Sequence, residues 1–407
     1  MPPQISGTAS TTTSPARIVP LLLTLCMLTA MTPLGIDMYL PGLPLLARSL
    51  TASNAATQLS VGIFLIGLVL GQLVFGPLSD RIGRRRRLLA GTAASAVFGV
   101  LCAFAPSIEL FLAARFLSGF CGAVGTVLAR AVIADTFKGA LLTRYTAYTA
   151  SVVGIAPVVA PPVGGAILHF TGSWRAIFLV LAGLGVLLTG CVWLWVPEPR
   201  PVRTREVESY RQTFTAMGKL LGNRAFTGNL LALAFISAAL YVYVADSAFV
   251  FEEHYGISVS LYSFVLVTNA IGLAAGSSLA GLLARRVQPA VMVRAGLAIS
   301  ALATVIHLAV ILTVGGSVVL SWLCLAGMLL GFGMMVPSSV VIGQVLGSQR
   351  PGAAAALLGT AQFALGAVIS PLGGLFGSTG PTPMAVLMFF ALLCAVLSQY
   401  LLTAAPK

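Results

Sequence analysis

Long apolar runs alternate along the chain with short polar clusters and Pro/Gly turns. A helix of about 20 apolar residues is long enough to cross the hydrocarbon core of a bilayer. Dividing the chain at these clusters predicts twelve spans, at residues 18–40, 57–78, 88–106, 109–131, 143–168, 175–196, 225–250, 259–284, 291–313, 317–343, 352–377 and 381–403. The pattern therefore predicts an all-α membrane protein.

The longest polar stretch divides these spans into two groups of six. The predicted regions are a disordered cytoplasmic leader (1–17), an N-terminal half (18–196), a cytoplasmic linker (197–224), a C-terminal half (225–403) and a short cytoplasmic tail (404–407). Several residues of the first half recur in the second at similar spacing: Gly71, Gly76 and Arg81 as Gly276, Gly281 and Arg286, Pro162-x-Gly164-Gly165 as Pro371-x-Gly373-Gly374, and Asp37 as Asp246. Two pseudo-symmetric six-helix halves are typical of transporters built from parallel repeats.

The composition supports this interpretation, since 58% of residues are hydrophobic and only 8% are charged, which excludes an ordinary water-soluble domain. The net charge of +13 is spread over loops rather than gathered on one surface, so it argues against a nucleic-acid partner. Lys and Arg near helix ends stay on the cytoplasmic side. All of these residues except Arg48, Arg115 and Arg175 fall on that side if both termini are cytoplasmic, so we expect a multi-pass protein of the cell (inner) membrane.

Motifs for an enzyme are absent from the sequence. It contains no P-loop, no G-x-S-x-G and no H-E-x-x-H, and its six cysteines lie in apolar runs without metal-ligand spacing. We expect no catalytic residue, cofactor or metal, and energy from an ion gradient or from the solute's own gradient. The run from Ile18 is too long for a signal peptide and is predicted to be an uncleaved first helix.

The most specific local pattern is the basic loop between the second and third spans. Its ordered frame consists of Gly76, Asp80, Arg81, Gly83 and Arg84, followed by three more arginines. A generic positive stop at the membrane surface explains the arginines but not the ordered frame. The loop resembles the signature of the major facilitator superfamily, G-x-x-x-D-R-x-G-R-R, and the resemblance implies that it is a conformational latch.

Two further stretches are similar to this superfamily. Arg115-x-x-Ser118-Gly119 resembles its R-x-x-Q-G motif, with Ser in place of Gln. A proline-rich stretch in the fifth span resembles the motif of proton-driven exporters, with Ala160 in place of a Gly; its members are Gly154, Pro157, Pro161, Pro162, Gly164 and Gly165. The whole pattern is close to the Bcr/CflA subfamily of drug:proton antiporters. That resemblance implies a kinked gate in the fifth span, although a packing kink would need the same residues.

Asp37 and Arg115 are the candidates for proton coupling. A charge at membrane depth costs at least about 2.5 kcal/mol and normally faces a cavity or a partner. The first span runs outward and the fourth inward, so the two residues lie at comparable depth and are expected to be able to meet. An apolar cavity favours the neutral acid whereas a nearby Arg favours the carboxylate. The alternatives are a helix-end cap for Asp37 and snorkelling for Arg115.

A second set of residues is predicted to line the substrate site. Its members are Asp37, Tyr39, Tyr148, Tyr241, Asp246 and Gln362. Asp246 departs from the subfamily pattern and lies close to the outer interface. Near the inner end of the fourth span, Arg130 and Asp135 are expected to form a cytoplasmic pair.

These features predict proton-coupled efflux of small amphipathic drugs or antibiotics of the bicyclomycin or phenicol kind, by a monomer in the lipid bilayer. The alternatives are transport of a metabolite such as a sugar or amino acid, and a receptor without transport. A receptor would need a sizeable signalling domain or tail, whereas only five residues follow Leu402.

Overall fold

The computed structural model describes residues 15–82, 84–197, 210–375 and 380–403. Within those ranges all regular structure is helical, and twelve segments are long and apolar enough to span a membrane. The predicted fold class is confirmed. Of the predicted regions, the tail (404–407), most of the leader, part of the linker and the loop residue Gly83 lie outside the described residues.

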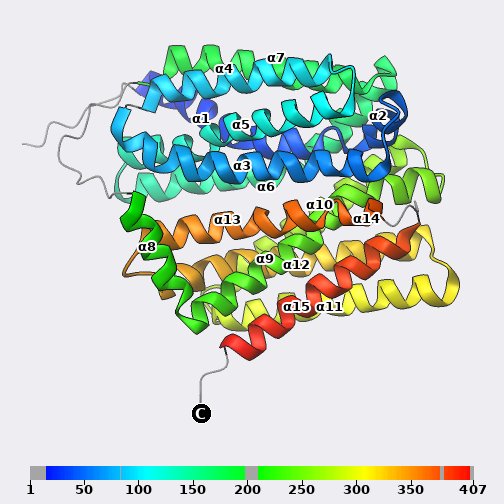
Figure 1. Cartoon of the computed structure of the whole chain (residues 1–407). Coiled ribbons are helices and arrows are strands. Elements are labelled where there is room, and N and C mark those ends of the chain that lie inside the picture. The colour runs from blue at the N-terminus through cyan, green and yellow to red at the C-terminus, as the bar shows by residue number, and fades with distance from the viewer. Residues whose placement is uncertain (1–14, 83, 198–209, 376–379, 404–407) are drawn as a thin grey trace, which may run out of the picture.

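The N-terminal half contains six spanning segments (Figure 1). They are formed by α1 (Pro15–Asp37), η1 (Leu40–Gly42) and α2 (Leu43–Ser49) together, α3 (Asn54–Ile82), α4 (Arg84–Ala103), α5 (Ile108–Thr136), α6 (Gly139–Thr171) and α7 (Trp174–Trp195). Side-chain caps and glycines fix several helix boundaries. Ser107, for example, accepts a hydrogen bond from Leu110 at the start of α5, and Gly172 ends α6 at a φ of +63°.

The C-terminal half repeats this arrangement. Its spans are α9 (Arg224–Ala248) with the π-helical turn η2 (Phe249–His254), α10 (Val259–Leu283), α11 (Pro289–Val314), α12 (Val318–Leu346), α13 (Pro351–Ile369) with α14 (Leu372–Leu375), and α15 (Pro381–Thr403). The linker contributes a helix that the sequence did not predict, α8 (Tyr210–Leu221). Its apolar residues Met217 and Leu220 are buried among residues of α9 and α13.

Glycines at corresponding positions let helices pack closely in both halves. A Cβ on Gly71 of α3 would collide with the backbone of Phe120 in α5. A Cβ on Gly276 of α10 would collide in the same way with the backbone of Leu330 in α12. The recurrence that was visible in the sequence therefore corresponds to one helix-packing contact made twice.

The two halves meet mainly at one end of the bundle. We call the end where α1 begins and α15 ends the terminal end, and the opposite one the distal end. Towards the distal end, a single hydrophobic core includes residues of both halves, such as Met38 and Leu65 with Val242 and Phe249. Towards the terminal end, the N-terminal half has its own core around Leu128, and a second core forms around Phe226 and Leu358 of the other half.

Three close contacts join the halves near the distal end. A Cβ on Gly62 of α3 would collide with the backbone carbonyl of Ala367 in α13, and one on Gly374 of α14 with the backbone of Ala55 in α3. Arg48 of α2 also forms an ion pair of 3.1 Å with Glu253 of η2. The distal end is thus closed in this conformation.

Candidate functional site

Asp37 is the last residue of α1, on the side of the N-terminal half that faces the other half. Its side chain is half-buried and forms no hydrogen bond or ion pair with any residue that the structure describes. Its neighbours in the chain, Ile36 and Met38, belong to the hydrophobic core that both halves share. An accessible, unpaired acid therefore lies where the two halves meet.

Arg115 of α5 is only 1% exposed and lies inside the N-terminal half. Its Nη1 donates a hydrogen bond of 3.1 Å to the carbonyl of Gly35, and its Nε donates one of 3.4 Å to the carbonyl of Ser60. The guanidinium also lies over the rings of Phe64, at 4.3 Å, and Tyr39, at 4.5 Å. Such cation–π contacts stabilise a desolvated charge by up to about 2 kcal/mol.

Asp37 and Arg115 do not form an ion pair in this conformation. Arg115 instead bonds to the backbone two residues before Asp37. The depth argument from the sequence places both residues near the same level but does not fix where their side chains point. Their predicted roles in proton coupling stay predictions.

A small cavity borders Arg115 within the N-terminal half. It has a volume of about 40 Å³, and the hydroxyl-bearing residues Thr32, Ser95 and Ser118 line part of it. One guanidinium nitrogen, Nη2, is buried without a partner among the described residues. The cavity has room for about three water molecules, and a drug would need roughly ten times that volume.

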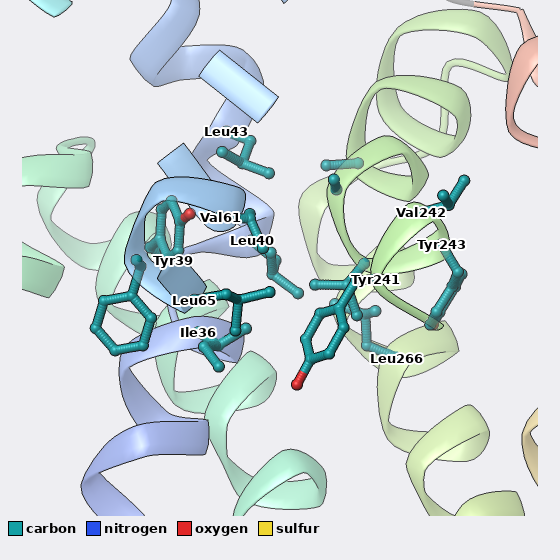
Figure 2. Close-up of a cluster of buried hydrophobic side chains, with 14 of the residues drawn as sticks. Ile36, Tyr39, Leu40, Leu43, Val61, Leu65, Tyr241, Val242, Tyr243 and Leu266 are labelled. Carbon is teal, nitrogen blue, oxygen red and sulfur yellow. The ribbon is translucent and has the colours of Figure 1, made fainter. Parts of the chain in front are cut away.

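Tyr241 and Gln362 both lie at the junction of the halves or close to it. Figure 2 shows the Tyr241 side chain extending from α9 toward Ile36 and Leu65 of the N-terminal half. The ring of Tyr241 packs against Phe363 with the centroids 6.1 Å apart. Gln362 is partly buried and donates to the carbonyl of Leu358 in its own helix, at 3.4 Å. Of the two, Tyr241 is the better placed to contact a molecule between the halves.

Two other tyrosines of the predicted substrate site lie elsewhere. Tyr39 is 1% exposed, donates to or accepts from Ser60 at 2.9 Å, and forms part of the wall around Arg115. Tyr148 is exposed near the terminal end of α6, where it accepts a 2.8 Å hydrogen bond from Arg144. The structure therefore does not bring Tyr39 and Tyr148 together with Tyr241 in one site.

Asp246 of α9 lies close to the distal end and is 4% exposed. It borders a cavity of about 10 Å³ that is also lined by Gln58 of α3 and Gly373 of α14. This volume holds at most one water molecule, so a drug cannot contact Asp246 in this conformation. The closed distal end separates this acid from any larger space between the halves.

The proline-rich part of α6 remains one helix, with Pro157, Pro161 and Pro162 inside it. Two of its glycines make close contacts. A Cβ on Gly164 would collide with the carbonyl of Met38, and one on Gly165 with the Ser263 hydroxyl in α10 of the other half. Nearer the terminal end, a Cβ on Gly154 would meet open space. The helix thus changes from tight packing near the distal end to open packing nearer the terminal end, and its role as a gate stays a prediction.

In the signature loop, the backbone of Gly76, Asp80 and Arg81 belongs to α3. Arg84, at the start of α4, forms an ion pair of 2.9 Å with Asp135 near the end of α5. The expected pairing of Asp135 with Arg130 is wrong, because the first turn of α4 lies closer to the acid. This ion pair joins the terminal ends of α4 and α5 within the N-terminal half.

Two further polar contacts were not predicted from the sequence. Asn269 of α10 donates to the Tyr243 hydroxyl at 3.0 Å, and Arg48 reaches Glu253 across the halves. The sequence shows that Arg48 and Glu253 carry opposite charges and follow predicted spans on the same side of the membrane. It does not show that they pair, because the pairing depends on how the two halves meet.

Known proteins resemble the chain over most of its length. The sequence pattern of the Major Facilitator Superfamily matches residues 25–371. An uncharacterized MFS-type transporter of Bacillus subtilis, YdgK, is 34% identical over 93% of this chain and 94% of its own. A bicyclomycin resistance protein homolog of Haemophilus influenzae is 28% identical over 94% of this chain and 96% of its own.

The fold is also found in solved structures. A D-xylose-proton symporter superposes with a TM-score of 0.74 over 94% of this chain and 98% of its own, at 14% sequence identity. This likeness concerns the fold alone, whereas the family pattern covers most of the sequence. The twelve spans, the repeated helix packing and the matched pattern agree: the chain is a membrane transporter, not an enzyme, and belongs to the major facilitator superfamily.

Proposed function

We propose that the chain exports small amphipathic drugs or antibiotics in exchange for protons, with its terminal end in the cytoplasm. The relative from Haemophilus influenzae that is named for bicyclomycin resistance supports a drug as the substrate. The distribution of Lys and Arg supports the orientation, because nearly all of them lie in segments at the terminal end. In this orientation the closed distal end is the outer face of the inner membrane.

The observation that carries the proposal is the position of Asp37. It is a half-buried acid at the junction of the halves, and no described residue holds it in an ion pair. An acid in such a place can exchange its proton when the two halves move apart or together. Tyr241 on the opposite side of the junction supplies an aromatic surface and a hydroxyl for a bound drug.

The conformation fits one stage of alternating access. The halves share one core near the outer face. Near the cytoplasm each half has its own core, and Leu73 of α3 packs against that of the other half, so fewer contacts would have to break for a drug to enter from the cytoplasmic side. Rocking of the halves would then open the outer face, release the drug and expose Asp37 to outside protons. Arg115 acts as a positioning residue here, since it holds the backbone at Gly35 next to Asp37.

The test is proton movement in proteoliposomes. Addition of bicyclomycin or chloramphenicol should move protons across vesicles that contain the wild-type protein, and Asp37→Asn should abolish that movement while the protein stays folded. Glu109→Gln is the control, because Glu109 is an exposed acid at the start of α5 and should not affect coupling. Unchanged proton movement in Asp37→Asn would contradict the assignment.

A second measurement separates drug export from metabolite transport. Expression in a drug-sensitive host should raise resistance to at least one compound of an antibiotic panel, and an uncoupler should remove the gain. Resistance that persists with the uncoupler would argue against proton exchange. No gain with any compound, combined with uptake of a sugar or amino acid, would replace the proposal by metabolite transport.

A further inference from the structure

Asp246 is an acid whose surroundings do not suit a negative charge. It is 4% exposed, and both of its carboxylate oxygens are buried without a hydrogen-bond partner among the described residues. An ionised carboxylate in such a place costs several kcal/mol unless a donor or a cation compensates it. The backbone of α14 lies directly against it, since a Cβ on Gly373 would collide with the carboxylate.

The charged groups on the neighbouring elements do not provide that compensation. Those of η2 are Glu252, Glu253 and His254, and Arg48 of α2 is paired with Glu253. The sequences of α13, α14 and α15 contain no charged or titratable side chain apart from Cys394 and Tyr400, which belong to the opposite half of α15. On α9 and α3, the charged residues other than Asp246 lie at the terminal end.

A second unpaired acceptor lines the same cavity. The Oε1 atom of Gln58, on α3 of the other half, is buried without a partner among the described residues. The remaining lining is apolar or backbone, with Phe249, Val250 and Met384 among it. A protonated carboxyl group is a donor and an amide oxygen is an acceptor. One proton on Asp246 therefore supplies the donor that both groups lack.

We propose that Asp246 binds a proton in the closed conformation, and that its carboxyl group then donates to Gln58 across the two halves, directly or through one water molecule. The cavity of about 10 Å³ has room for that single water. Opening of the distal end would hydrate Asp246 and allow it to ionise. With the Gln58 amide oriented as it is in this conformation, the ionised group would face the amide oxygen, so protonation of Asp246 favours closure.

This proposal rests on the proposed exchange function only for its use in transport. The contact between protonated Asp246 and Gln58, which we call the distal latch, is a property of the fold. By linkage, a ligand that binds one conformation stabilises that conformation. Protons therefore favour the closed distal end. Once Asp246 ionises in the open state, the ratio of closed to open molecules should fall by up to about tenfold for each unit of rising pH, because a single proton is released.

The experiment measures the opening of the distal end directly. Spin labels are placed at Leu45 of α2 and Leu261 of α10, two exposed positions near the distal ends of opposite halves, in protein whose other cysteines are replaced. Electron–electron distances are recorded between pH 5 and pH 9 in nanodiscs without a drug. The wild type should shift from a short to a long distance as the pH rises, and Asp246→Asn should keep the short distance throughout.

Two further variants complete the test. Gln58→Leu removes the acceptor and should raise the open population at low pH. Glu109→Gln should keep the pH response, since Glu109 is exposed at the start of α5 and does not line the Asp246 cavity. A wild type without a pH response, or an Asp246→Asn protein that responds like the wild type, would overturn the proposal. Proton movement coupled to a drug is measured separately, so failure of the distal latch and failure of the proposed function give different results.

Discussion

Arg115 shows how a membrane helix can hold a charge without an acid beside it. Backbone carbonyls of α1 and α3 accept its hydrogen bonds, and the rings of Phe64 and Tyr39 cover its faces. The planar guanidinium is suited to this because it can donate at its edge and stack through its faces at the same time. The hydrogen bond to Gly35 therefore fixes the end of α1, which includes Asp37, relative to α5.

We expect Arg115→Lys to destabilise the protein although the charge is kept. An ammonium group cannot stack on two rings while it reaches both carbonyls, and each buried acceptor left without a donor costs about 1–3 kcal/mol. The melting temperature in detergent should fall clearly. Arg48→Lys is the matched control, because the Arg48 side chain is 71% exposed and should change stability little. Equal melting temperatures of the two variants would contradict this account of Arg115.

Some residues of the candidate site could be predicted from the sequence one residue at a time. Asp37, Arg115 and Asp246 stand out because a charged residue inside an apolar run is costly and needs a reason. The partners of these residues could not be predicted. Arg115 bonds to backbone carbonyls, which leave no mark in a sequence, and Asp246 lines a small cavity together with a glutamine from the other half.

Among the helices, α6 has the sequence pattern most directly related to the proposed movement of the two halves, because its glycines lie both at close contacts and in open space. Its glycines contact the η1 side of the same half and α10 of the other half near the distal end, while Gly154 is open. A glycine that touches a backbone leaves no space for a methyl group, whereas a glycine in open space tolerates one. The two kinds of position can therefore be tested within one helix.

We expect Gly164→Ala to be damaging and Gly154→Ala to be tolerated. The added methyl group at Gly164 would strike the carbonyl of Met38, and overpacking of this kind costs about 1–3 kcal/mol. At Gly154 the substitution removes backbone freedom and should leave the melting temperature equal or slightly higher. Melting curves and drug resistance of the two variants are the measurements. A stable, fully active Gly164→Ala protein would show that α6 can move away from η1 without loss.

At the scale of the whole molecule, the contact between the halves defines the conformation. The ion pair of Arg48 with Glu253 lies on the closed side, next to the shared core and to the cavity between Asp246 and Gln58. Alternating access requires these contacts to break once in each cycle. A covalent cross-link between the two halves at the distal end should therefore stop transport.

We expect Arg48→Cys combined with Glu253→Cys to be joined by a bifunctional methanethiosulfonate reagent in the resting protein, and the cross-link to block transport. The long native side chains reach each other to 3.1 Å, so a reagent that replaces their length can join the two shorter thiols when the distal end is closed. The six native cysteines must first be replaced, and none of them forms a disulfide. Mobility on a gel reports the bond, and dithiothreitol should restore transport. Full transport by the cross-linked protein would rule out opening at this end.

The sequence by itself determined the number and the positions of the membrane spans and the division into two related halves, because the length and polarity of a segment decide whether it crosses a bilayer. Only the tertiary structure decided which residues come together: Arg115 bonds to Gly35, Asp135 pairs with Arg84, and Asp246 shares a cavity with Gln58. A helix that is apolar on all sides gives no sign of how it is rotated about its axis. That rotation follows from close packing against neighbours far away in the chain, and it places every polar partner in this protein.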